Sequence, residues 1–203
     1  MSECYNKVES INTMLLLAHA GITLGAATVL AGVVKSRHST EIRKVSWFTS
    51  LSGYIDIRLL LVGSLLPDII DKPVGLFFFQ ETFSNGRIFS HTLLFLIIIA
   101  AVGFYLYKRR RQVWLLTLAS GTFTHLVLDE MWRAPGTLFW PFLGFTFDRV
   151  ELMYWLPNVF QDLMSNPVVY VPEAAGIAIL LWFGLALAGR KRVGVFLKYG
   201  KVN

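Results

Sequence analysis

The sequence predicts an all-α fold: a polytopic membrane bundle of about five transmembrane helices with interfacial aromatic segments, forming a single integral membrane domain over residues 1–203. Composition is the first reason, because 55% of the residues are hydrophobic and 16% are charged, whereas an ordinary soluble domain carries about 25% charged residues. The second reason is the length of the apolar stretches. Stretches close to the ~20 residues that a membrane-crossing helix needs occur at residues 13–34, 51–70, 89–107, 112–131 and 172–189.

The stretch at residues 51–70 is less regular than the other four, because it contains Asp56, Arg58 and Pro67. Proline disfavours helical backbone at the residue before it, so we expect regular helix to end near Leu66. Non-helical backbone at membrane depth is tolerated only where it is buried in protein or lines a wet cavity. The expected break at Pro67 therefore indicates a polar site.

Basic residues predict the orientation of the chain. The segments 35–44, 108–111 and 190–201 alternate with the apolar stretches and hold thirteen of the nineteen Lys and Arg residues. Because cytoplasmic loops carry the excess of Lys and Arg, we expect the N-terminus outside the cell (inner) membrane and the C-terminus in the cytoplasm. The net charge of +6 then reflects topology and contact with membrane lipid, and no nucleic acid is expected as a partner. The single cysteine, Cys4, is assigned no role.

The ionisable residues of the apolar stretches, each of which costs roughly 2.5–3.5 kcal/mol near the bilayer centre, include three histidines and two aspartates near the expected outer ends of four stretches. These five residues are His19, Asp68, His91, His125 and Asp129. At about 1.5 Å of rise per helical residue, all five are expected within about 10 Å of the same extracytoplasmic face. Agreement among four separate stretches indicates a shared polar site.

A divalent metal explains the cluster, because imidazole and carboxylate are ligands of zinc, manganese and iron. His125 and Asp129 are four residues apart, so both can point at one ion. Each residue also has a structural alternative. His91 can start a helix, His19 can belong to a small-residue packing face with Gly21, and Asp129 can cap the end of its helix.

Five short segments, in this order, resemble those of a known family: HAG at 19–21, LLPDIID at 65–71, RIFSHT at 87–92, THLVLD at 124–129 and LFWP at 138–141. They are similar to the membrane-bound metal-dependent hydrolases, also described as LexA-binding, inner-membrane-associated hydrolases. The resemblance implies a hydrolase whose His and Asp residues bind metal, a role that maps onto the five residues above.

The chain departs from the family pattern in two places. The second acid of the LPDxD element falls one residue late, at Asp71, and the first histidine of the HRGxTHS element is absent because Gly86 precedes Arg87. Asp71 is the candidate general base or ligand-orienting carboxylate, and Arg87 is the candidate clamp for an anion. The alternatives are a solvated turn at Asp71 and Lys72, and an interface anchor at Arg87.

A His/Asp site with an open coordination position activates water and polarises an ester, so hydrolysis is the expected reaction and zinc the expected metal, with manganese and iron as alternatives. Aromatic residues on the same side of the membrane form an interfacial belt or roof a lipid-facing pocket. They are Phe77, Phe78, Phe79, Phe139, Trp140, Phe142, Phe145, Phe147, Tyr154, Trp155 and Phe160. The expected substrate is a lipid or a lipid-linked phosphoester.

Two other classes of protein remain open. A transporter would carry ionisable residues through to the cytoplasmic side, but only Asp56 and Arg58 lie there, and two positions apart on a helix they would not face one another. A structural or regulatory membrane protein would hold a structural metal with every coordination position closed.

Overall fold

The structure is a computed structural model, and it describes residues 15–38, 55–147 and 160–200. Within these ranges the chain forms helices and turns and no strand, which confirms the all-α prediction. Cys4, Tyr154 and Trp155 lie outside the described residues. The helices are α1 (Leu16–His38), α3 (Ile57–Pro73), the π-helix η1 (Val74–Phe78), α4 (Leu93–Arg110), α5 (Trp114–Leu128), the 3-10 helix η2 (Met131–Arg133), α6 (Pro135–Leu138), α8 (Pro167–Gly189) and α9 (Val193–Tyr199).

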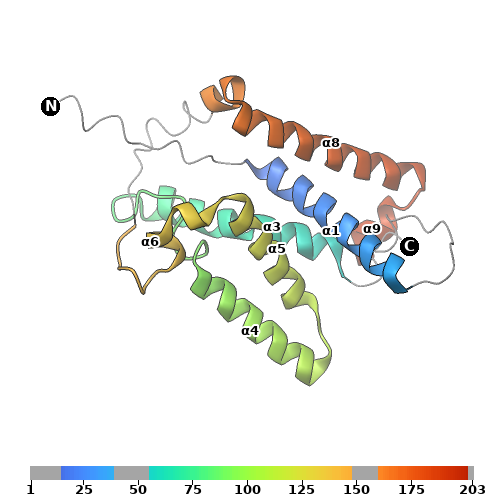
Figure 1. Cartoon of the computed structure of the whole chain (residues 1–203), viewed down its shortest axis with the longest axis horizontal. Helices are drawn as coiled ribbons and strands as arrows, with labels where there is room; N and C mark the ends of the chain where they lie inside the picture. The colour runs from blue at the N-terminus through green and yellow to red at the C-terminus, as the bar shows by residue number, and fades with distance from the viewer. Residues whose placement is uncertain (1–14, 39–54, 148–159, 201–203) are drawn as a thin grey trace.

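The longer helices pack side by side in the order α8, α1, α3, α5, α4 (Figure 1). Glycines allow the closest approaches. A Cβ atom on Gly21 of α1 would lie 2.2 Å from the carbonyl oxygen of Gly176 in α8, and one on Gly63 of α3 would lie 2.4 Å from the carbonyl oxygen of Leu118 in α5. Any larger residue at these positions would push the helices apart, so the small-residue packing face expected around Gly21 is present.

Polar side chains share the interior with a small apolar core, and many large apolar side chains are exposed. Large apolar side chains cover the outside, where Leu30 of α1 and Leu185 of α8 are 65% and 72% exposed. The interior contains His, Asp, Thr and Ser side chains. Contiguous apolar surface of this kind marks contact with lipid or with another protein.

Among the described helices, α8 is the one long and apolar enough to cross a membrane, while residues Leu16–Ala31 and Trp114–Leu128 form shorter apolar helices. Helix α4 ends in three basic residues, and its start at Leu93 is set by Thr92, whose hydroxyl accepts a hydrogen bond from the Phe95 amide at 3.1 Å. The arrangement of five membrane spans stays a prediction.

The expectation that helix ends near Leu66 is wrong, because α3 continues through Pro67 to Pro73. Proline has no amide hydrogen, so the carbonyl of Gly63, four residues earlier, loses its helical donor. The hydroxyl of Thr122 in α5 donates to that carbonyl at 3.2 Å instead. A neighbouring helix thus satisfies the freed group, as is common for proline in membrane helices.

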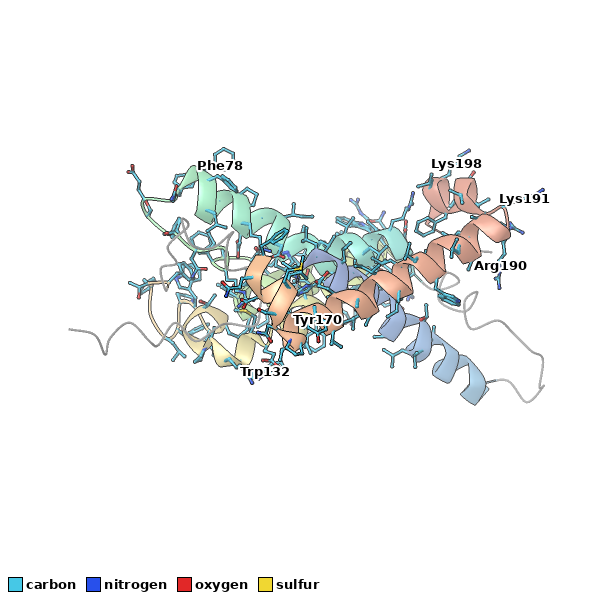
Figure 2. The ribbon with its side chains drawn as sticks, turned by 90° about the horizontal axis from the view of Figure 1, so that it is seen from above. Phe78, Trp132, Tyr170, Arg190, Lys191 and Lys198 are labelled. Carbon is cyan, nitrogen blue, oxygen red and sulfur yellow. The ribbon has the colours of Figure 1, made fainter. Side chains whose placement is uncertain are left out.

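The two ends of the bundle differ in chemistry. Phe78 and Trp132 lie at one end of the long axis, and Arg190, Lys191 and Lys198 lie at the opposite end (Figure 2). Helix α3 begins at the basic end, because the Ile57 amide donates to the Gly200 carbonyl at 3.2 Å. The five candidate ligands belong to the aromatic end, since Asp68 precedes η1 and Asp129 precedes η2.

Asp56 and Arg58, at the basic end, do face one another, which corrects the expectation from their helical spacing. Asp56 lies outside α3 as its N-cap, and its carboxylate accepts from the Arg58 amide at 2.9 Å and from the guanidinium at 2.7 Å. The guanidinium also donates to the Leu197 carbonyl of α9 at 2.7 Å. Through these hydrogen bonds Asp56 and Arg58 hold α9 against the start of α3.

Candidate metal centre

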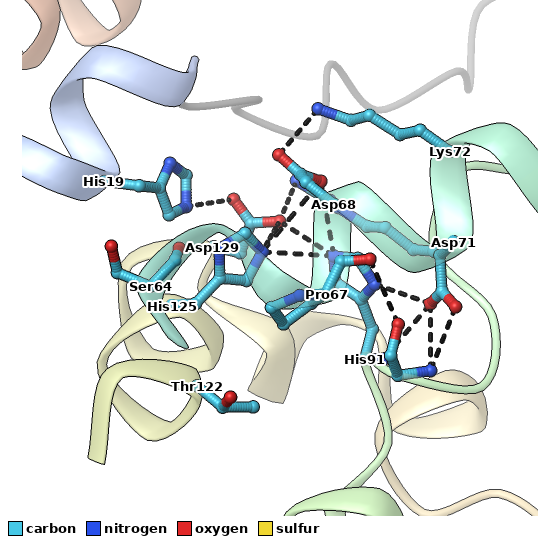
Figure 3. A network of polar contacts seen from close by, with 12 residues as sticks. His19, Ser64, Pro67, Asp68, Asp71, Lys72, His91, Thr122, His125 and Asp129 are labelled. Atoms are coloured by element: carbon cyan, nitrogen blue, oxygen red, sulfur yellow. Dashed lines mark hydrogen bonds and ion pairs between the residues drawn. The ribbon is translucent and has the colours of Figure 1, made fainter. Parts of the chain in front are cut away.

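The five residues expected from the sequence converge on one buried cluster (Figure 3). His19 comes from the first turns of α1, Asp68 from the last turns of α3, His91 from the turn before α4, and His125 and Asp129 from the end of α5. The three histidines are fully buried, and the two aspartates are 4–5% exposed. Four segments of the chain therefore supply this cluster.

Three ligand atoms of the cluster, from Asp68, His91 and His125, have the mutual spacing of a metal site, and an oxygen of Asp129 lies near two of them. The Nε2 atoms of His91 and His125 are 3.2 Å apart. Oδ1 of Asp68 lies 3.6 Å from the first and 4.0 Å from the second, and Oδ2 of Asp129 lies 3.8 Å from each. Bonds of ~2.0–2.1 Å place tetrahedral ligands roughly 3.3 Å apart, so these separations need little adjustment around one ion.

The other ring nitrogen of His91 is committed to Asp71. The Nδ1 atom lies 2.7 Å from Oδ2 of this carboxylate, which can only accept, so we assign the ring proton to Nδ1. Asp71 is fully buried and also accepts from the backbone amides of Ile88, Ser90 and His91 at 2.8 to 3.2 Å. Asp71 thus fixes both the ring and the turn that carries it.

The remaining two histidines have the same arrangement with backbone carbonyls as acceptors. Nδ1 of His125 lies 2.7 Å from the Ser64 carbonyl, and Nδ1 of His19 lies 3.0 Å from the Leu15 carbonyl. Carbonyl oxygens cannot donate, so both rings carry their proton on Nδ1. Metal-ligating histidines almost always donate their second ring N–H in this way.

With each ring neutral, three Nε2 lone pairs face carboxylate oxygens and one another. Nε2 of His19 and Oδ1 of Asp129 are 3.1 Å apart, buried, and without a hydrogen-bond partner. Acceptors packed against acceptors are unfavourable unless a cation lies among them. The ligand atoms of the cluster include both nitrogen and oxygen. These residues therefore fit zinc, manganese or iron better than calcium or magnesium, which prefer oxygen ligands.

Two basic side chains contact the cluster. Nη2 of Arg87 lies 2.8 Å from Oδ2 of Asp129, and its side chain is 12% exposed, so this arginine is held at the cluster. Lys72, whose Nζ lies 2.7 Å from Oδ2 of Asp68, was missed by the sequence reasoning. The error followed from ending the helix at Leu66, since continuous helix places Asp68 and Lys72 four residues apart on one face.

The alternative of a solvated turn at Asp71 is wrong, because this residue is fully buried within α3. Its carboxylate already accepts hydrogen bonds from the backbone and from His91. This favours an orienting role over that of a general base.

The WP element lies against the turn that carries His91. The Trp140 ring is 5.3 Å from the Phe89 ring and 6.0 Å from the Phe147 ring. Phe89 precedes His91 by two residues, so aromatic packing supports the ligand's backbone. Phe78 and Phe142 are about four-fifths exposed and can meet lipid.

Glu173 is a second residue that the sequence reasoning missed. It is a buried carboxylate of α8, and it accepts from the Ala18 amide at 3.2 Å, one residue before His19. A lone acid in the most apolar stretch of the chain was the available signal. Its contact ties the start of α1 to α8.

The comparisons with known proteins give one match. The chain matches the model of the YdjM inner membrane protein family over residues 14–195. No curated protein and no solved structure matches significantly. The family description confirms membrane association and an inner-membrane location, and it names no reaction, so the hydrolase activity implied by the resemblance stays a prediction. Because the match covers most of the described helices, the chain belongs to the YdjM inner membrane protein family.

Proposed function

We propose that this chain is a membrane-embedded metal-dependent hydrolase that acts on a lipid or lipid-linked phosphoester at the extracytoplasmic face of the inner membrane. One observation carries the proposal. Three buried histidines donate their Nδ1 protons to protein acceptors and direct their Nε2 lone pairs at two buried carboxylates. A metal cation among these atoms would relieve the contacts between acceptors, and the second ring N–H of each histidine is donated as in known metal sites.

His91, His125 and Asp68 would hold the ion and leave one coordination position for water, and Asp71 and the Ser64 carbonyl would fix the imidazoles. A divalent ion in such a site acidifies water and withdraws electron density from the oxygen of a bound ester. In the reaction, the water oxygen forms a bond to phosphorus, the bond between phosphorus and the alcohol oxygen breaks, and the water proton passes to the departing alkoxide.

The charges around the cluster favour an anionic substrate. Arg87 and Lys72 each pair with a carboxylate of the cluster, and both cations can turn toward the oxygens of a phosphoryl group. The exposed aromatic residues Phe78 and Phe142 suit the apolar part of a lipid. These features together support a phosphoester over a neutral ester.

A structural metal is the second candidate, and the Asp129 oxygen near both imidazole nitrogens favours it, because a fourth protein ligand would complete a tetrahedron. A transporter has less support. Its ionisable residues would continue through the bundle, whereas at the basic end Asp56 and Arg58 are already paired with each other.

The test is turnover by the detergent-purified protein, loaded with zinc or manganese, on phospholipids, polyprenyl phosphates and p-nitrophenyl phosphate esters. We expect hydrolysis by wild type and a loss of at least 100-fold in Asp129→Ala and His91→Ala. Glu81→Gln is the matched control, because Glu81 is an exposed carboxylate on the loop between η1 and α4. Metal bound without turnover of any of these substrates would favour a structural ion instead.

A further inference from the structure

We infer that the cluster holds two metal ions, with the Asp129 carboxylate between them. This inference rests on the proposed metal centre and deepens it. The buried ligand atoms form two overlapping groups, each with its atoms within 4.8 Å of one another: Asp68, His91 and His125 in the first, and His19, His125 and Asp129 in the second. Neither group contains all five residues.

The first ion has enough ligands without His19. Nε2 of His125 has a single lone pair and serves one ion only. It belongs to both groups, and because it lies 3.2 Å from Nε2 of His91 we assign it to the first ion. With Oδ1 of Asp68 the first ion has three protein ligands, and Oδ2 of Asp129 lies 3.8 Å from both imidazole nitrogens.

The second ion would lie at His19. The two atoms of the cluster that lack any hydrogen-bond partner are Nε2 of His19 and Oδ1 of Asp129, and these are the two that the first ion leaves unused. The two oxygens of Asp129 therefore face different partners: Oδ1 is 3.1 Å from His19, and Oδ2 is 3.8 Å from both His91 and His125. Two-metal hydrolytic sites place their ions about 3.5–4 Å apart, a separation that one carboxylate can bridge.

A further unpaired atom lies on the same face of α1. Thr23 follows His19 by four residues, which places both side chains on one face, and its buried hydroxyl oxygen has no hydrogen-bond partner. A proton shared by His19 and Asp129 would satisfy those two atoms and leave Thr23 unsatisfied. A hydrated ion at His19 brings water that can reach the hydroxyl.

The experiment measures bound metal directly. Apoprotein is loaded with manganese and desalted, its metal content is determined by mass spectrometry, and its electron paramagnetic resonance spectrum is recorded. We expect two ions per chain with an exchange-coupled spectrum in wild type, and one ion with the six-line spectrum of isolated manganese in His19→Ala. His38→Ala is the control, because His38 ends the same helix, about 28 Å along the axis from His19 at 1.5 Å per residue.

The outcomes separate this inference from the proposed function. One uncoupled ion per chain in wild type would overturn the two-ion centre and leave a one-ion hydrolase in place. No bound metal in wild type would overturn both. The wild-type spectrum alone decides between one and two ions, so the conclusion does not depend on the folding of the variant.

Discussion

Replacing Asp71 by asparagine tests how the ligand His91 is held. The carboxylate accepts from Nδ1 of His91 at 2.7 Å and from three backbone amides of the same turn. Asparagine keeps one oxygen and presents an NH2 group to donors, so it cannot serve them all. Loss of an orienting partner typically costs 10–100-fold in metal affinity, which corresponds to roughly 1.4–2.7 kcal/mol. We expect a loss in this range for Asp71→Asn.

The assay is competition with a chromogenic chelator for zinc in detergent, with thermal unfolding of the apoproteins recorded in parallel. Glu81→Gln makes the same chemical change at an exposed position and should bind zinc as wild type does. The apoprotein of Asp71→Asn should also unfold at a lower temperature, since each buried donor left unpaired costs about 1–3 kcal/mol. If the folded variant holds zinc as tightly as Glu81→Gln does, Asp71 does not position the ligand.

Two further predictions concern α3 and the topology. Thr122→Val should reduce the free energy of unfolding by about 1–3 kcal/mol because it strips the Gly63 carbonyl of its donor, and by less in a Pro67→Ala background, which restores a helical N–H. Equal losses in the two backgrounds, measured by denaturant titration, would contradict this account of the proline. In intact spheroplasts an impermeant maleimide should label Cys4 and, in a Cys4→Ser background, should leave Lys198→Cys unlabelled. Labelling of Lys198→Cys would reverse the orientation.

The sequence predicts the members of the cluster well, because buried ionisable residues are costly and few structural roles account for them. The depth of a residue in the membrane can be predicted by counting residues along its helix. That count places His19 and His91 near one level, and the structure brings them into one cluster. The partners of the Nδ1 atoms could not be predicted, because they are backbone carbonyls and a carboxylate from other segments.

Pro67 caused the main error in the prediction from the sequence, which ended the helix at Leu66. A rule for isolated helices ends the helix before Pro67, but in the bundle a hydroxyl from α5 replaces the missing amide. The consequence extends beyond the backbone, since Lys72 and Asp71 take their places at the cluster only if α3 continues. A tertiary contact that replaces a single hydrogen bond cannot be predicted from the local sequence.

The middle of α3 organises the cluster through carbonyl oxygens as much as through side chains. Gly63 accepts from Thr122, Ser64 from the His125 ring, and Pro67 from the Ser90 hydroxyl at 3.0 Å. Carbonyls in an apolar interior are costly when unpaired and strengthen their bonds when paired. Through these three contacts α3 fixes the ring on α5 and the turn before α4. The imidazole ligands His125 and His91 are therefore held by one helix, and a shift of α3 would move them together.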